Sequence, residues 1–456
     1  MIVVRNAEVV VTMDAARREI RGGSVLIDGN QIVAVGPMVE ANGARVIDAR
    51  GCVVLPGFIN GHHHMFQSLT RAIGTGKGLA LFDWLKLLYT VWRHLDPEAA
   101  YISAKLALSE LLLTGATTVA DHLYLYPNGV RLEDTIRAAI ELGVRFHPTR
   151  GAMTLGQSQG SFVPDDLVER DDAVLADCLR LLQEVHDPSP RSMLRIGLAP
   201  CSPFNATQNL MRESAKMARA HKAVGLHTHL CETLDEERFC LEKFNKRPIQ
   251  YAADLGWVGE DVWYAHMVHP SSAEVTFLAN HRCGACHCPT SNMLLASGIA
   301  PVRDMIDQGV RLGIGVDGTA SNDGNHMLGE ARQAMLLQRV GWPGFESHAD
   351  RMPAREALEL ATVGGASMLG RNDIGSLEEG KAADLVAFRV DGLQHAGAQG
   401  DIVAGLLTCA PASAWLSIIN GRVVVESGAI VGLDTGALAE RHNAASGSML
   451  RKAGLG

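Results

Sequence analysis

The sequence lacks both a long uncharged apolar run and a cluster of basic residues. No stretch approaches the roughly 18 consecutive apolar residues of a membrane-spanning helix, and the N-terminus has no basic segment followed by an apolar one, as a signal peptide would. The net charge is −9 and lysine and arginine are scattered, so nothing favours binding to nucleic acid or to an anionic membrane. We therefore expect a cytoplasmic protein whose partners are small molecules.

The chain also lacks a cysteine pattern that would suggest a disulfide framework. Its nine cysteines are an odd number scattered over 456 residues, which fits reduced thiols. Because a domain usually has ~100 to 200 residues, this length suits one large catalytic domain with a smaller appendage, or two to three ordinary domains.

Both ends of the chain alternate short β-branched runs with turn signals. Near the N-terminus these runs lie in VVRNAEVVVT and GGSVLIDGNQIVAVG, and near the C-terminus in GKAADLVAFRV and SIINGRVVVESGAIVG. This pattern is typical of antiparallel strands joined by tight turns. We predict that the two ends pair into one small β-sandwich domain of residues 1–57 and 376–456.

Between these ends, residues 58–375 alternate short apolar strands with helical stretches, the pattern of βα units around a parallel sheet. Eight such units predict an α/β fold, a (β/α)₈ TIM-type barrel that forms the catalytic domain. The predicted strands are VVLPGFINGHH, ATTVADH, VRFHPTRG, LRIGLAPCSP, VGLHTHLCE, VWYAHMV, GACHCPTSN and RLGIGVDG.

Histidines and acidic residues gather at the C-terminal ends of these strands, where the catalytic face of such a barrel lies. His62 and His64 are two residues apart, so on an extended strand both side chains point to one face and can bind one ion, whereas His63 points away. Imidazoles and a carboxylate suit Zn²⁺ or another divalent transition ion. Later strands end in further candidates, namely His227, His229, Glu232, His266, His269 and Asp317.

A second candidate metal site lies in HRCGACHC, where Cys283, Cys286 and Cys288 with His281 or His287 could imitate a structural zinc site. A structural site usually closes four ligands with a second Cys/His pair elsewhere, and no such pair is visible. Small cysteines on a buried strand are the simpler interpretation. The sequence also lacks H-x-E followed by P-C-x-x-C, the zinc-site signature of one class of nucleobase deaminases.

The strand-end motifs PGFINGHHH, HTHLCET, YAHMVH and GVDGTASND occur in this order along the chain. In this order they resemble the amidohydrolase superfamily, specifically its mononuclear metal-dependent deaminase branch with guanine deaminases and triazine hydrolases. Within that family, the longer stretches LFDWLKLLYTVWRHL, LAPCSPF and GACHCPTSNMLLASGI are similar to bacterial 8-oxoguanine deaminases. One departure is Thr90, where the family pattern would have proline.

The resemblance implies a role for each motif residue. His62, His64, His229 and Asp317 match the ligands of one divalent ion per chain, zinc with iron as the alternative. A single ion is expected because strand four, in LRIGLAPCSPF, has neither the lysine nor the glutamate that bridges a second ion in binuclear relatives.

Glu232 and His266 match the family's catalytic proton-transfer pair, and Asp317 can also accept a proton from the attacking water. By the same resemblance we expect a homo-oligomer.

Three residues are candidates for contact with the substrate, and each also has an interpretation as an ordinary loop or core residue. The amide of Gln67 could read the lactam edge of a ring, Trp92 could stack on a planar ring, and Cys201 could line the same pocket.

The favoured hypothesis is hydrolytic deamination of an aminated purine lactam by metal-activated water, with 8-oxoguanine converted to urate and ammonia. A second hypothesis keeps the metal chemistry and changes the ring or leaving group, as in an isocytosine or guanine deaminase or an s-triazine chlorohydrolase or aminohydrolase. A third is a non-catalytic metal-binding protein. The presence of Glu232 and His266 beside a full set of ligands argues against the third.

Overall fold

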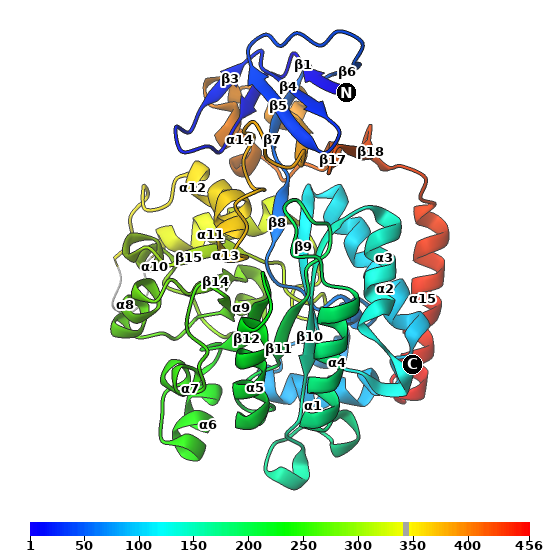
Figure 1. Cartoon of the computed structure of the whole chain (residues 1–456), viewed down its shortest axis with the longest axis vertical. Coiled ribbons are helices and arrows are strands. Elements are labelled where there is room, and N and C mark those ends of the chain that lie inside the picture. The colour runs from blue at the N-terminus through cyan, green and yellow to red at the C-terminus, as the bar shows by residue number, and fades with distance from the viewer. Residues whose placement is uncertain (341–345) are drawn as a thin grey trace.

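The computed structural model describes residues 1–340 and 346–456 of the chain. Eight parallel strands close into a barrel, with helices between successive strands on the outside (Figure 1). This confirms the predicted (β/α)₈ TIM-type fold. In chain order the barrel strands are β8 (Phe58–Asn60), β9 (Ala116–Leu123), β10 (Arg145–Ala152), β11 (Gly197–Pro200), β12 (Gly225–Leu230), β13 (Val262–His266), β14 (Gly284–His287) and β15 (Arg311–Ile314).

The first predicted strand is divided between two sheets. Its residues Val53–Pro56 belong to strand β7 (Cys52–Pro56), which pairs with strands outside the barrel, and only β8 enters the barrel. The chain passes from one sheet to the other at Gly57, where an added Cβ would lie 2.1 Å from Oγ1 of Thr117. The lack of a side chain at this position lets the two sheets lie against each other.

The helices cover the barrel on its outer side, and the first long pair follows strand β8. They are α1 (Leu81–Trp92), α2 (Pro97–Leu113), α3 (Leu132–Leu142), α4 (Asp171–Glu184), α5 (Gln208–Arg219), α6 (Leu234–Phe244), α7 (Pro248–Asp254), α8 (Ser272–Asn280), α9 (Pro289–Leu294), α10 (Val302–Gln308), α11 (Met327–Arg339), α12 (Ala354–Glu359) and α13 (Gly365–Met368), with a π-helical turn η6 (Leu360–Gly364) before α13. Short 3₁₀ turns are η1 (Met65–Thr70), η2 (Gly74–Gly76), η3 (Pro127–Gly129), η4 (Gln157–Gln159), η5 (Asp165–Leu167), η7 (Leu393–His395) and η8 (Ala398–Gly400).

Two further sheets lie at one end of the barrel (Figure 1). The seven-stranded sheet combines strands from both chain ends, which meet where β7 from the N-terminal part pairs with β16 from the C-terminal part. In spatial order it contains β19 (Ala429–Ile430), β18 (Arg422–Glu426), β17 (Ala414–Ile419), β16 (Leu385–Arg389), β7, β2 (Val9–Val11) and β3 (Glu19–Arg21). The four-stranded sheet contains β5 (Gln31–Gly36), β4 (Ser24–Asp28), β1 (Ile2–Arg5) and β6 (Arg45–Asp48).

Apolar residues from both sheets share one core, which includes Val25 and Ile27 on β4 and Leu385 and Ala387 on β16. The predicted domain boundaries, 1–57 with 376–456 and 58–375, stay a prediction.

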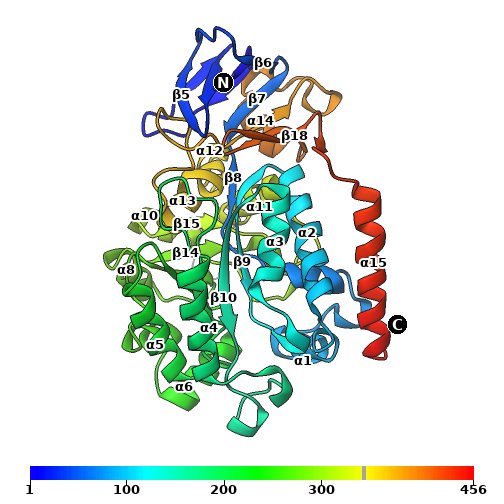
Figure 2. The same cartoon turned by 45° about the vertical axis from the view of Figure 1, so that its right-hand side comes forward.

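Two helices follow the barrel in sequence, α14 (Ile402–Thr408) and α15 (Thr435–Lys452). Helix α15 lies along the outside of α2, as both views show (Figures 1 and 2). His442 on α15 lies 2.9 Å from Oγ of Ser68 in turn η1, so the last helix supports the segment that follows the first strand. Among the described residues, no helix is long and apolar enough to cross a membrane.

Candidate active site

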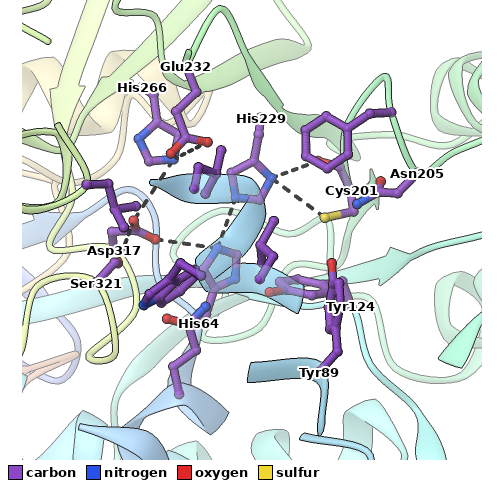
Figure 3. Close-up of a pocket in the computed structure, with 16 residues that line it drawn as sticks. His64, Tyr89, Tyr124, Cys201, Asn205, His229, Glu232, His266, Asp317 and Ser321 are labelled. Atoms are coloured by element: carbon purple, nitrogen blue, oxygen red, sulfur yellow. Dashed lines mark hydrogen bonds and ion pairs between the residues drawn. The ribbon is translucent and has the colours of Figure 1, made fainter. Parts of the chain in front are cut away.

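The four side chains that were predicted to bind one ion come together at the carboxyl ends of the barrel strands. Figure 3 shows three of them, His64, His229 and Asp317. His64 Nε2 lies 3.0 Å from His229 Nε2, and Asp317 Oδ1 lies 3.2 Å from His62 Nε2 and 3.4 Å from His64 Nε2. Ligand atoms ~2.0–2.1 Å from a tetrahedral ion are about 3.3 Å from one another. The separations in the cluster therefore match the spacing that a zinc-sized ion requires.

The hydrogen bonds of His64 and His229 fix which ring nitrogen is free. Nδ1 of His64 lies 2.7 Å from the carbonyl oxygen of His122, and Nδ1 of His229 lies 2.7 Å from that of Cys201. A carbonyl oxygen can only accept, so Nδ1 carries the proton in both rings and Nε2 keeps its lone pair.

His62 also has a protonated Nδ1 and an unprotonated Nε2, and here the partner of Nδ1 is a second imidazole. Nδ1 of His227 lies 2.9 Å from the carbonyl oxygen of Trp263, so it donates and leaves Nε2 of His227 as an acceptor. Nδ1 of His62 lies 2.8 Å from that Nε2 and must donate to it. The Nε2 atom of His62 therefore also carries a bare lone pair. Such outer partners orient metal-binding histidines in many proteins.

A divalent cation fits this arrangement, because several buried electron pairs face one another without a proton between them. Burial holds the pKa values of His62 and His229 well below the ordinary histidine value, so both rings are neutral. Nε2 of His62 and Oδ1 of Asp317 have no hydrogen-bond partner among the described residues. Neutral imidazoles and one carboxylate are the donor set that zinc prefers.

His122, which sequence reasoning missed, is a further histidine in the same cluster. Its ligand atom lies within 4.8 Å of those of His62, His64 and His229. Nε2 of His122 lies 3.0 Å from the carbonyl oxygen of Ala199 and donates to it. The residue lies on strand β9, and the motif ATTVADH ends on it, so its position near a strand end was the available signal.

Glu232 and His266 lie beside the cluster. Oε2 of Glu232 is 3.7 Å from Nε2 of His266, which in turn is 4.0 Å from Oδ2 of Asp317. Burial raises the pKa of Glu232 to about 7. Burial would lower the pKa of His266, but the carboxyl groups of Glu232 and Asp317 outweigh it and raise that pKa. The pair therefore holds a proton near neutral pH at the edge of the cluster.

The backbone at two of these positions is unusual. His266 has φ = 72° and Asp317 has φ = 62°, the left-handed region that residues other than glycine seldom adopt. Such conformations cost of order 1–3 kcal/mol and concentrate at functional sites.

Three polar side chains that the sequence reasoning did not select hold His266 and Asp317 in place. Oδ1 of Asn292 accepts a hydrogen bond from Nδ1 of His266 at 2.9 Å. Asp317 Oδ2 accepts hydrogen bonds from Ser291 Oγ at 2.6 Å and from Ser321 Oγ at 3.0 Å. Their signal in the sequence is their position, because Ser291 and Asn292 end the predicted strand GACHCPTSN and Ser321 comes three residues after RLGIGVDG.

Glu236 was also missed, and it supports the loop that carries Glu232. Its carboxyl oxygens accept hydrogen bonds from the backbone N–H groups of Cys231 and Glu232, both at 2.9 Å. Glu236 is fully buried in the first turn of helix α6. The same helix start therefore fixes the direction in which Glu232 leaves the strand.

A small cavity opens in front of the cluster. Gln67 and Cys201, two of the three predicted substrate contacts, line this cavity. Trp92 does not. It is buried against Phe66, and its indole N–H donates to Thr70 Oγ1 at 3.1 Å. The aromatic residues that do line the cavity are Trp84, Tyr89, Tyr124 and Phe204.

Trp92 and several lining residues lie on the same helix, α1. Leu81, Trp84, Leu85 and Tyr89 of this helix reach the cavity. Trp92 comes about one turn after Tyr89 and passes beyond the cavity wall. The helical period predicts a buried face, but it does not predict where along that face the cavity ends.

The remaining sequence candidates lie elsewhere. His63 points away from the cluster, and its Nε2 lies 2.9 Å from Oδ1 of Asn325. His269 lies 2.7 Å from the carbonyl oxygen of Ser297 and does not line the cavity. Within the described parts of the chain, no cysteine belongs to a group that could hold a metal ion, so the second candidate site in HRCGACHC does not form.

Known proteins are similar to this chain along most of its length. The sequence model of the amidohydrolase family matches residues 53–424. An 8-oxoguanine deaminase from Pseudomonas aeruginosa is 43% identical over 98% of this chain and 98% of its own length, and a hydroxydechloroatrazine ethylaminohydrolase from a Pseudomonas species is 36% identical over 93% and 90%.

Solved structures show the same fold. An atrazine chlorohydrolase from Arthrobacter aurescens, crystallised with zinc, superposes with a TM-score of 0.93 at 36% identity, covering 98% of this chain and 100% of that one. The match therefore covers almost the whole of both chains. The chain therefore belongs to the amidohydrolase family and is a metal-dependent hydrolase.

Proposed function

We propose that this hydrolase deaminates an aminated purine lactam, and that 8-oxoguanine is converted to urate and ammonia. The observation that carries the proposal is the 43% identity, along almost the whole of both chains, to a protein named 8-oxoguanine deaminase. The cavity is consistent with such a substrate, because no lysine or arginine is among the described residues that line it. It therefore suits a neutral ring flanked by aromatic walls better than a substrate with an anionic group.

In this proposal His62, His64, His229 and Asp317 hold one divalent ion, zinc with iron as the alternative. When bound there, the ion supplies a water molecule with a pKa near ~7, which can attack at neutral pH. Strand β11 (Gly197–Pro200) has no lysine or glutamate that could bridge a second ion. One ion per chain is therefore expected.

Glu232 and His266 move the protons. Glu232 is buried and its pKa is raised to about 7, so it can deliver a proton to the ring nitrogen next to the carbon under attack. Nδ1 of His266 donates its hydrogen bond to Asn292, which leaves Nε2 of the ring available. This nitrogen can take a proton from the attacking water. That proton then goes to the departing amino group, which leaves as ammonia as the carbon–nitrogen bond breaks. The proton that remains on the added oxygen returns to the Glu232 carboxylate, so the oxo product forms and Glu232 is restored. Asp317 is close enough to share this step.

In this proposal Gln67 and Cys201 contact the substrate. Trp84 or Tyr89, which line the cavity, stacks on the ring in place of Trp92. A cytoplasmic location and a homo-oligomeric state complete the proposal. All nine cysteines are free thiols, which fits a reducing compartment. Size-exclusion chromatography with light scattering would test the oligomeric state.

A second candidate is hydrolysis of an s-triazine, with loss of chloride or an alkylamine. It is supported by the structural similarity to an atrazine chlorohydrolase and by the sequence similarity to an ethylaminohydrolase. Guanine and isocytosine deamination use the same amino-lactam edge as 8-oxoguanine. A non-catalytic metal-binding protein has the least support, because Glu232 and His266 would then lack a role.

The test is kcat/KM for 8-oxoguanine, guanine, isocytosine and a chloro-s-triazine, followed by release of ammonia or chloride. We expect 8-oxoguanine to be the best substrate and isocytosine to be slower, since isocytosine has the same edge without the fused ring. A ring that leaves buried polar groups of the cavity unpaired loses roughly 1–3 kcal/mol of binding free energy for each unpaired group. If the triazine is best, or if 8-oxoguanine is not hydrolysed, the purine assignment is wrong.

A further inference from the structure

Gly318 follows Asp317 directly and lies against the side chain of Gln67. A Cβ atom added to Gly318 would lie 1.9 Å from Oε1, 2.3 Å from Cδ and 3.0 Å from Nε2 of Gln67. Such distances are far below van der Waals contact, so the amide group of Gln67 rests directly on the backbone of Gly318. Any side chain at position 318 would push that amide away.

The other glycines of the motif RLGIGVDG have a different environment. A Cβ at Gly315 would meet the backbone N of His62 at 2.8 Å, and one at Gly313 would meet the Cα of Gly365 at 3.0 Å. Those two glycines allow main chains to pack closely. At Gly318 the three nearest atoms all belong to the end of one flexible side chain, that of Gln67, and the φ of Gly318 lies outside the left-handed region. Alanine at 318 should therefore leave the fold intact and displace only the Gln67 amide.

Hydrogen bonds fix the main chain of Gln67 independently of Gly318. It lies in turn η1, three residues after the predicted ligand His64, and its backbone N–H donates to the carbonyl oxygen of His64 at 3.0 Å. Its carbonyl oxygen accepts from Thr70 Oγ1 at 3.0 Å, and Trp92 donates to that same hydroxyl. Gln67 is 2% exposed, and its Oε1 has no hydrogen-bond partner among the described residues. A buried acceptor without a partner is costly, so a donor on a bound ring is its natural partner.

We propose that Gly318 determines substrate specificity by seating the amide of Gln67. Without a side chain at 318, the amide rests against the main chain and presents its unpartnered Oε1 to the edge of the ring. A larger residue would turn the amide and change which ring edge the cavity reads. The inference rests on the proposed function only in requiring that the substrate contacts Gln67.

A double-mutant cycle tests this inference, using the wild type, Gly318→Ala, Gln67→Ala and the double variant with 8-oxoguanine. We expect Gly318→Ala to raise KM about 10-fold or more with little change in kcat, because a recognition contact is lost and the proton-transfer groups are untouched. In the Gln67→Ala background the same change should alter KM less than about 2-fold, since no amide remains to be displaced. Metal content should stay at the wild-type value in all four proteins.

Gly324→Ala is the matched control, because the nearest atom to a Cβ at Gly324 is Asn322 Oδ1 at 3.6 Å, an ordinary contact. It should leave KM unchanged. The inference is overturned if Gly318→Ala keeps the wild-type KM, or if its effect is equally large with and without the Gln67 amide. A crystal structure of Gly318→Ala gives a readout that needs no turnover, since the Gln67 amide should move while His62 and Asp317 stay in place.

Failure of the proposed function can be distinguished from failure of this inference. If the wild type does not hydrolyse 8-oxoguanine, the purine assignment is wrong, and the cycle is run with the best ring of the substrate panel. Loss of coupling between positions 67 and 318 on that ring, or an unmoved Gln67 amide in the crystal structure, would then refute the role of Gly318 by itself.

Discussion

Oε2 of Glu232 lies 3.7 Å from Nε2 of His266, and both side chains are buried beside Asp317. Each group responds to this setting, because the Glu232 carboxyl raises the pKa of His266 and burial raises the pKa of Glu232 to about 7. A proton is therefore available at neutral pH on one side of the cavity, where a ring nitrogen would need it. The roles of the chain in proton transfer and in metal binding can therefore be tested by separate substitutions.

Glu232→Gln should keep the metal ion and lower deamination by about 10²-fold or more, because the amide preserves size and hydrogen-bonding reach but delivers no proton. The measurement is kcat together with metal content by mass spectrometry. Glu242→Gln is the matched control, since Glu242 is an exposed glutamate on the nearby helix α6. Activity near the wild-type level in Glu232→Gln would remove this residue from the mechanism.

His229→Ala should lose most of the bound ion, because the three remaining ligands bind an ion more weakly than four. The wild type should carry about one equivalent, measured after extensive dialysis. His281→Ala serves as the control because His281 is exposed and belongs to the rejected HRCGACHC site. Two equivalents in the wild type, both needed for turnover, would contradict the single-ion proposal. Loss of metal from His281→Ala would instead point to the cysteine-rich segment.

Asn292→Ala tests whether the hydrogen bond to His266 matters for catalysis. Loss of Oδ1 leaves Nδ1 of His266 without its partner, so the ring can turn or change tautomer. We expect kcat to fall about 10- to 100-fold, while KM and metal content change little.

Asn292→Asp keeps an acceptor at the same place and should restore most of the orientation. Its negative charge would raise the pKa of His266 further, so the acidic limb of the pH profile should move to higher pH. If both variants had the same kcat and pH profile, Asn292 would have only a packing role.

The sequence predicts the strand ends well and the connections between them poorly. His62 and His64 could be paired because residues two apart on a strand share a face. The links from His227 to His62 and from Asn292 to His266 could not, since each joins different strands or helices through a single hydrogen bond. No local pattern records such a contact. The break at Gly57 was hidden for a similar reason, because the segment VVLPGFIN is largely apolar and gives little sign that it serves two sheets.

Arg145 and Asp384 form a buried ion pair at the end of the barrel away from the cluster. Arg145 begins strand β10, and Asp384 precedes strand β16 of the seven-stranded sheet. Nε of Arg145 lies 2.8 Å from Oδ2 of Asp384, and Nη2 lies 3.0 Å from Oδ1. The guanidinium also donates to the carbonyl oxygens of Arg191 and Ser192. This pair ties the barrel to the appended sheet.

Arg145→Met should destabilise the protein by about 3–5 kcal/mol, because it leaves the carboxylate of Asp384 buried without its cation. Adding Asp384→Asn removes that unpaired charge, and the amide oxygen can still accept the N–H of Asn420, which now binds Asp384 at 2.7 Å. The double variant should therefore recover part of the loss, as measured by urea unfolding. Deamination by the folded fraction should stay near the wild-type rate in both, since the pair lies far from the cavity. Equal stability of the single and double variants would show that the packing of Arg145, rather than its charge, joins the two parts.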